Sequence, residues 1–287
     1  MDVQAADTAA KLAKTDLLTD MVGEFPELQG IMGGYYAKHD GLGEAVADAI
    51  EDHYKPRFAG DELPRNPVGL VVALADKLET LVGMFGIGQV PTGDKDPFAL
   101  RRHALGVIRM LIERDLPLGI DWLVGSGEAA CFKAIGSSVS FDELKGFIFD
   151  RLAGSLREQG YSAQEVDAVL ALRPQQLGDI AKRLAAVRAF AALPEAAALA
   201  AANKRVGNIL KKIEGELPSE VKEGLLVEEA ERALFSSMAA LRPRADAAFD
   251  VGDYSASLQA LAALRAPVDA FFDAVMVNAE DPALRQN

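Results

Sequence analysis

The sequence predicts an all-α protein, and three observations support this fold class. Apolar residues recur at spacings of three and four along most of the chain, which is the period of a helix with one buried face. Alanine and leucine are abundant, whereas runs of β-branched residues are few. No segment shows the strict alternation that would predict a strand with confidence, so packed helices are the expected architecture.

Several long segments show helical periodicity, and each has its own apolar stripe. They are residues 43–54, 71–85, 97–112, 141–160, 162–172, 174–193, 194–213, 225–249 and 254–277. Local start signals strengthen some of them. Ser162 with Glu165 forms a predicted capping box, and Asp253 precedes an apolar stripe. Pro174 and Pro194 suit the first turn of a helix, where a missing N–H costs nothing.

The length of 287 residues indicates about two domains. The clearest interruption of the helical pattern is Gly136-Ser137-Ser138, followed by a new start at Ser140. We therefore expect one helical domain over residues 1–138 and a second over residues 139–287.

Charge is distributed unevenly along this acidic chain, whose formal net charge is −13. Residues 1–150 carry 14 basic and 24 acidic side chains, a net of −10. Residues 173–212 instead carry eight basic and two acidic side chains, a net of +6. Overall acidity argues against indiscriminate nucleic-acid binding, but a local basic segment permits a specific contact with phosphates.

Targeting signals are not expected in this sequence. The first residues lack a basic segment followed by an apolar one, so we expect no signal peptide. No run of eighteen uncharged apolar residues predicts a transmembrane helix. The single Cys131 cannot form an internal disulfide and is predicted to be a small core residue, which fits a reducing cytoplasm.

Residues 86–97 resemble a phosphate-binding loop only superficially. Gly88 and Gly93 have the right spacing, but Asp94 follows where lysine is needed, and a helix precedes the loop instead of a strand. We predict a turn between helices, with Asp96 as N-cap and Pro97 as the first helical residue.

A metal-dependent phosphohydrolase of the HD type is the alternative function. His39-Asp40 and a later Asp76 are the weak candidate ligands, because such enzymes hold one or two divalent ions with this pair and a further aspartate. The expected upstream histidine is missing, and Thr15-Asp16 lacks the histidine as well, so we predict no working metal site. The carboxylate pairs Glu51-Asp52 and Glu228-Glu229 are expected to be solvated.

Several cationic segments are candidate phosphate contacts. The strongest is the helix over residues 201–213, since no acidic residue occurs between Glu195 and Glu214. Lys55 and Arg57 lie in a Pro-containing connection, and Arg101 and Arg102 lie near a helix start, where exposed amides also attract anions.

Five segments closely resemble the β subunit of bacterial heterotetrameric glycyl-tRNA synthetase: residues 16–41, 53–64, 74–113, 202–212 and 271–287. The resemblance implies the C-terminal portion of a longer chain, which in the family continues with an "NRL" helix. It implies a degenerate HD-like domain followed by an anticodon-binding domain of the type shared with arginyl-tRNA synthetase.

The resemblance also implies partners and site residues. The AMP-forming class II active site, with ATP and glycine, would belong to the α subunit of an α2β2 enzyme in the cytoplasm, and this chain would bind the tRNA for glycine without carrying the chemistry or a cofactor. The implied tRNA contacts are basic and polar side chains on three parts of the chain: Lys204, Arg205, Asn208, Lys211 and Lys212; then Arg242, Arg244 and Arg285; then Lys55, Arg57, Arg101 and Arg102. A scaffold that only docks partners is a third hypothesis.

Overall fold

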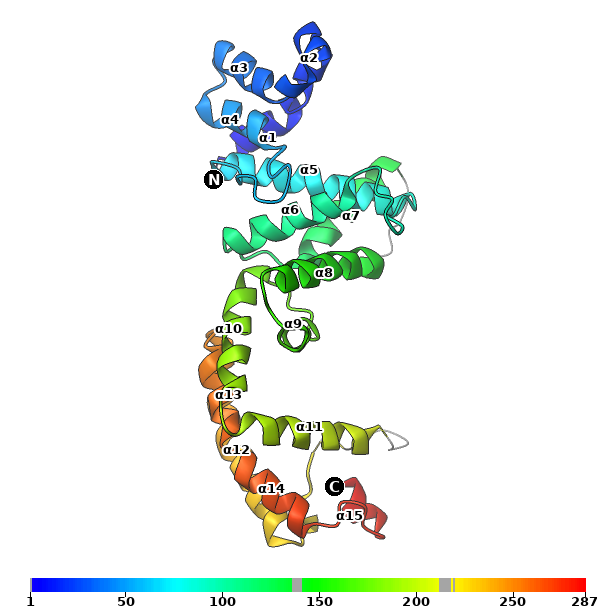
Figure 1. The fold of residues 1–287 in the computed structure, drawn as a ribbon, viewed down its shortest axis with the longest axis vertical. Helices are drawn as coiled ribbons and strands as arrows, with labels where there is room; N and C mark the ends of the chain where they lie inside the picture. The colour runs from blue at the N-terminus through cyan, green and yellow to red at the C-terminus, as the bar shows by residue number, and fades with distance from the viewer. Residues whose placement is uncertain (1, 136–140, 212–217, 219) are drawn as a thin grey trace. The chain divides into compact units, whose positions relative to one another are not determined.

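The computed structural model describes residues 2–135, 141–211, 218 and 220–287. Within these residues every regular element is a helix, and the only bridges are the isolated pairs Thr92–Lys95 and Gly119–Gln176 (Figure 1). The predicted all-α class is confirmed. No single helix of the described chain is long and apolar enough to cross a membrane, although one pair bent by 103° passes that test jointly.

The chain forms two compact units, residues 1–180 and 181–287. The expected domain boundary near residue 138 lies outside the described residues. The helices on its C-terminal side, α8 and α9, belong to the first unit, because α8 packs against α6 and α7, and α9 packs against α8.

The first unit contains nine α-helices among its described residues: α1 (Val3–Leu12), α2 (Asp20–Glu24), α3 (Ile31–His39), α4 (Glu44–Asp52), α5 (Pro67–Gly86), α6 (Leu100–Glu113), α7 (Ile120–Ile135), α8 (Phe141–Glu158) and α9 (Ala163–Leu170). Short 3-10 turns at Thr15–Leu18, Pro26–Leu28 and Leu177–Asp179 connect them. Helix α5 contacts α1, α4, α6 and α7, so it is the central element of this unit.

Two kinds of side chain fill the first unit. Where α1, α3, α4 and α5 meet, the buried residues are mostly small: Ala6, Ala9, Ala13, Ala37, Val46, Ala47, Ala49, Ile50, Val68 and Val72. Small side chains let the helix axes approach closely. Around α6 and α8 the core is made of larger residues, among them Leu111 and Ile148, which are fully buried.

The second unit is built from α10 (Ile180–Ala191), α11 (Ala196–Leu210), α12 (Glu229–Asp250), α13 (Tyr254–Ala262), α14 (Arg265–Ala274) and α15 (Pro282–Gln286) among its described residues. Helix α12 packs against α13 and α14, and α11 packs against α14. Helix α11, which carries most of the candidate contacts in residues 201–213, therefore packs against α14.

Some predicted helix boundaries are confirmed and others are wrong. Ser162 and Glu165 form the predicted capping box, and the carboxylate of Asp253 accepts from the Ala256 amide at 2.9 Å. The segment 174–193 becomes helical only from a 3-10 turn at Leu177, and α11 begins two residues after Pro194.

The segment 254–277 is two helices, α13 and α14, and not one. Pro267 explains the division, because proline has no N–H and its ring clashes with the carbonyl four residues earlier, at Ala263, where α13 has just ended. Helix α13 packs against α12, whereas α14 packs against both α12 and α11.

Helix α6 begins at Leu100 and not at Pro97. Ala99 precedes it in the left-handed region, with φ of 53°, so the backbone is not helical before that point. The N-cap is Ala99 and not Asp96, but the carboxylate oxygens of Asp96 still accept from the amides of Leu100 at 2.8 Å and Arg101 at 3.0 Å. The turn before it, with Gly88 at a positive φ, follows the end of α5 at Gly86.

Lys77 of α5 is buried at 3% exposure, and its Nζ donates to the backbone carbonyl of Tyr54 at 3.2 Å. Burial lowers the pKa of Lys77 to about 8, whereas the pKa of a lysine in the unfolded chain is about 10.4. Between these values the unfolded chain binds more protons than the folded one, so the free energy of unfolding rises with pH.

We therefore expect the first unit to become more stable as the pH is raised from 7.5 to 10, as measured by urea unfolding. Replacing Lys77 with methionine should remove this rise, while the same change at exposed Lys11 should retain it. An undiminished rise in Lys77→Met would show that another group is responsible.

Candidate nucleic-acid interface

The exposed face of α11 carries the cationic side chains that the sequence predicted. Lys204, Asn208 and Lys211 are exposed and follow one another at spacings of four and three, so they share one side of the helix. Lys212 lies outside the described residues. Among the described residues neither Lys204 nor Lys211 has a carboxylate within ion-pair distance, which leaves their charges uncompensated.

Arg205 is also exposed but makes a specific contact with α14. Its guanidinium carbon lies 4.0 Å from the centroid of the Phe272 ring, within the range of a cation–π interaction. The arginine is therefore held at one place on the helix surface while its positive charge remains.

The second group of predicted contacts is less uniform. Arg242 of α12 is exposed, but its Nε lies 3.4 Å from the Asp246 carboxylate one turn later. Arg244 is exposed on the same helix. Arg285 is exposed on α15.

The cations of residues 53–64 have internal partners. Lys55 is buried at 8% exposure, with its Nζ 3.2 Å from Asp52 and 3.4 Å from Glu62, which corrects the expectation of a surface lysine. Arg57 is half exposed, but its Nε and its backbone N–H both donate to Asp61.

The lowered pKa of Asp61 reflects its hydrogen bonds with Arg57. Burial alone would raise the pKa of Asp61, yet the hydrogen bonds from Arg57 outweigh it and lower that pKa to about 2. Since Lys55 and Arg57 are compensated within the fold, they are weaker candidates for an external anion than the lysines of α11.

The arginines at the start of α6 differ from each other. Arg101 is half buried and its Nη2 donates to the carbonyl of Gly93 in the preceding turn, so its side chain secures that turn. Arg102 is exposed and has no carboxylate within ion-pair distance among the described residues. Of these two arginines, only Arg102 is exposed.

The candidate metal ligands do not converge. His39 Nδ1 lies 3.1 Å from the Asp40 carboxylate, and both side chains are exposed. Asp76 on α5 is instead paired with Lys14, at 2.5 Å. Nowhere in the described residues do three or more histidine, cysteine, aspartate or glutamate side chains gather as metal ligands would, so the phosphohydrolase hypothesis has no support.

Asp16, which would be the aspartate of a His-Asp pair at residues 15 and 16, has a structural role. It is buried at 1% exposure, and its Oδ2 accepts from the amides of Gly30 at 2.6 Å and Gly33 at 3.1 Å. These are free amides at the start of α3, so the carboxylate completes a helix N-terminus.

Comparison with known families identifies the family to which this chain belongs. Residues 1–171 match the family described as the glycyl-tRNA synthetase beta subunit. The chain belongs to this family. Residues 199–287 match the DALR anticodon binding domain. The second match includes α12 to α15 and the part of α11 from Leu199 onward, so Lys204 and Lys211 lie within the residues that match the DALR domain.

Similar proteins carry the same family name. The chain is 74% identical over its full length to the glycine–tRNA ligase beta subunit of Janthinobacterium sp. (strain Marseille), of which it covers 41%. It is 71% identical over 282 residues to that of Dechloromonas aromatica (strain RCB), of which it covers 40%. The chain thus spans about two fifths of the length of these relatives.

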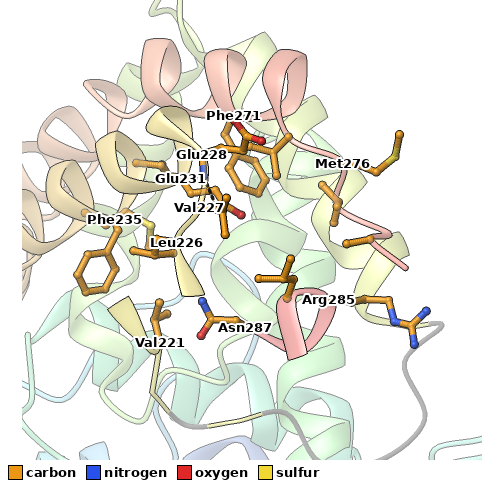
Figure 2. A pocket seen from close by; sticks show the side chains of 16 residues that line it. Val221, Leu226, Val227, Glu228, Glu231, Phe235, Phe271, Met276, Arg285 and Asn287 are labelled. Atoms are coloured by element: carbon orange, nitrogen blue, oxygen red, sulfur yellow. Dashed lines mark hydrogen bonds between the residues drawn. The ribbon is translucent and has the colours of Figure 1, made fainter. Parts of the chain in front are cut away.

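An apolar groove of about 330 Å³ lies on the second unit of this glycyl-tRNA synthetase β-family chain (Figure 2). Phe235 of α12 and Phe271 of α14 line it, and Arg285 lies at its edge with its side chain extending away from the two rings. Asn287 anchors this end, because its Oδ1 accepts from the Lys222 amide at 2.7 Å.

The sequence did not reveal the burial and pairing of residues whose partners are distant along the chain. Asp52, expected to be solvated, is fully buried and bound to Arg65. Phe272 is half buried, and its ring lies against the guanidinium of Arg205. Neither pairing has a local signature, since both depend on how separate elements pack.

Proposed function

We propose that this chain is the tRNA-binding part of a glycine–tRNA ligase β subunit and that the exposed face of α11 contacts the tRNA backbone. The observation that carries the proposal is the set of uncompensated cations on α11, within the residues that match an anticodon-binding domain. Exposed lysines with no carboxylate of the described residues within ion-pair distance are suited to phosphate oxygens, and backbone contacts provide affinity and position.

The proposed interface has a principal part and secondary parts. Lys204, Arg205, Asn208, Lys211 and Lys212 form the principal contact. Arg242, Arg244 and Arg285 would lie closer to the anticodon, whose unstacked bases are read by stacking and by hydrogen bonds to their edges. Arg102, and Arg101 beside it, would contact another part of the tRNA from an HD-like domain.

The assembled enzyme would divide its work between two polypeptides. We propose an AMP-forming class II ligase in the cytoplasm, in which the α subunit binds ATP and glycine and forms the bond, with two α and two β subunits. The names of the relatives support a partner subunit, because a ligase with a beta subunit implies a second kind of subunit. This part of the β subunit would bind and orient tRNA without its own cofactor.

The salt dependence of tRNA binding tests the proposal. Fluorescence anisotropy with labelled glycine tRNA should show saturable binding whose log affinity falls linearly with log salt, by roughly 0.7–0.9 per phosphate neutralised. Binding should persist when EDTA is added. If tRNA does not bind while the α subunit still co-purifies with the chain, the role is that of a scaffold and the proposal fails.

A further inference from the structure

Arg205 differs from the other cations on α11 in having a fixed partner. Its guanidinium carbon lies 4.0 Å from the centroid of the Phe272 ring, and no carboxylate of the described residues lies within ion-pair distance of it. Lys204 and Lys211, by contrast, have flexible four-carbon stems and no described partner. Arg205 is thus the cation of this face whose position is set by tertiary structure.

Helix α14 presents two adjacent rings to two different neighbours. Phe271 lines the apolar groove beside α12, as Figure 2 shows, whereas Phe272 lies against Arg205 of α11. The two rings meet edge to face, with centroids 5.4 Å apart. This edge-to-face arrangement, between two partly buried rings, is one that aromatic pairs favour, and it orients the ring of Phe272.

An aromatic partner has a different electrostatic consequence from a carboxylate. Arg265, on the same helix α14, pairs with Asp269 at 3.6 Å, and that contact offsets its charge. The ring of Phe272 attracts the guanidinium through its quadrupole but leaves the net charge of +1 intact. Since the five N–H donors lie in the guanidinium plane, they remain available to a phosphate at its edge.

We infer that Phe272 is a positioning residue for tRNA binding: it holds Arg205 on the exposed face of α11 so that the guanidinium meets a backbone phosphate. The inference rests on the proposed function and adds a residue that touches no nucleic acid itself. Preorganisation is the physical basis, because an arginine already held in place loses less side-chain freedom on binding.

A double-mutant cycle tests this inference. Affinity for glycine tRNA is measured at one fixed salt concentration for the unaltered chain, Phe272→Leu, Arg205→Ala and the double variant. Phe272→Leu should bind about two- to fivefold more weakly, the range expected for an exposed cation–π contact. In the Arg205→Ala background the same change should have no further effect, and Phe272→Tyr, which keeps the ring, should bind as the unaltered chain does.

Each outcome supports or overturns the inference. An equal loss from Phe272→Leu in both backgrounds, or no loss in either, would overturn it. If Phe272→Leu lowers the thermal midpoint of unfolding, the variant Arg205→Lys is measured in its place, since lysine keeps the positive charge without the planar guanidinium. Unchanged tRNA affinity of Arg205→Lys would also refute the positioning role.

Failure of the inference can be told apart from failure of the proposed function. If Arg205→Ala binds normally while Lys204→Glu and Lys211→Glu bind weakly, only the positioning role is wrong. If none of these changes weakens binding, α11 is not the interface.

Discussion

Reversing Lys204, Lys211 and Lys212 to glutamate is expected to weaken tRNA binding by about a hundredfold at low salt. The first two side chains are exposed, and no carboxylate of the described residues compensates them, so each is free to neutralise a phosphate. The slope of log affinity against log salt should also become shallower by roughly 2 to 3, because about one counterion is released for each phosphate contact. Anisotropy titrations at four or more salt concentrations measure both quantities.

A matched control separates this local effect from overall charge. Lys11→Glu, Lys38→Glu and Arg157→Glu make the same change in net charge on the first unit, where each cation already lies near a carboxylate. We expect the control to keep most of its affinity and its slope. Equal losses in the two triple variants would mean that net charge, and not the face of α11, determines binding.

Replacing Asp52 with alanine is expected to destabilise the first unit by about 3–5 kcal/mol. Asp52 is fully buried, and its carboxylate accepts from Arg65 Nε at 2.9 Å and the Arg65 amide at 2.7 Å, with Lys55 Nζ at 3.2 Å. Burial alone would raise the pKa of Asp52, but these partners outweigh it and lower that pKa. Without the carboxylate, the buried ammonium of Lys55 loses its nearest counter-charge.

Urea unfolding at pH 7 measures this loss, and Asp7→Ala is the matched control. Asp7 forms an ion pair of 2.7 Å with Lys11, but both side chains are exposed, so its removal should change stability by no more than about 0.5 kcal/mol. If Asp52→Ala unfolds at the same urea concentration as Asp7→Ala, the buried network does not stabilise the unit. The exposed face of α11 should be unaffected in either variant.

The accuracy of the sequence predictions follows the range of the interactions involved. The helix over 71–85 and the capping box of Ser162 were predicted correctly, because periodicity and capping act within one or two turns. The start of α6 was placed too early, since a left-handed Ala99 separates Asp96 from the helix. The division of 254–277 was missed although Pro267 was visible in the sequence.

Charges were harder to interpret than helices. The sequence offers Lys55, Arg57 and Lys204 all as candidate phosphate contacts, with the helix that carries Lys204 as the strongest, and it places Asp52 in a solvated run. In the structure Lys55 is buried against Asp52, and Arg57 is bound to Asp61, while Lys204 is exposed. Which cation is free depends on which carboxylates lie within about 4 Å of it, and that is a property of packing.

The sequence by itself determined that this protein is helical and that one late segment is basic without interspersed acids, because both properties are set by residues close together along the chain. Its similarity to a known family was equally a property of the sequence. Only the tertiary structure determined which cations have no carboxylate partner among the described residues. It also determined that the ring of Phe272 contacts Arg205. Those contacts join residues on separate helices, and their distances are defined only once the helices have packed.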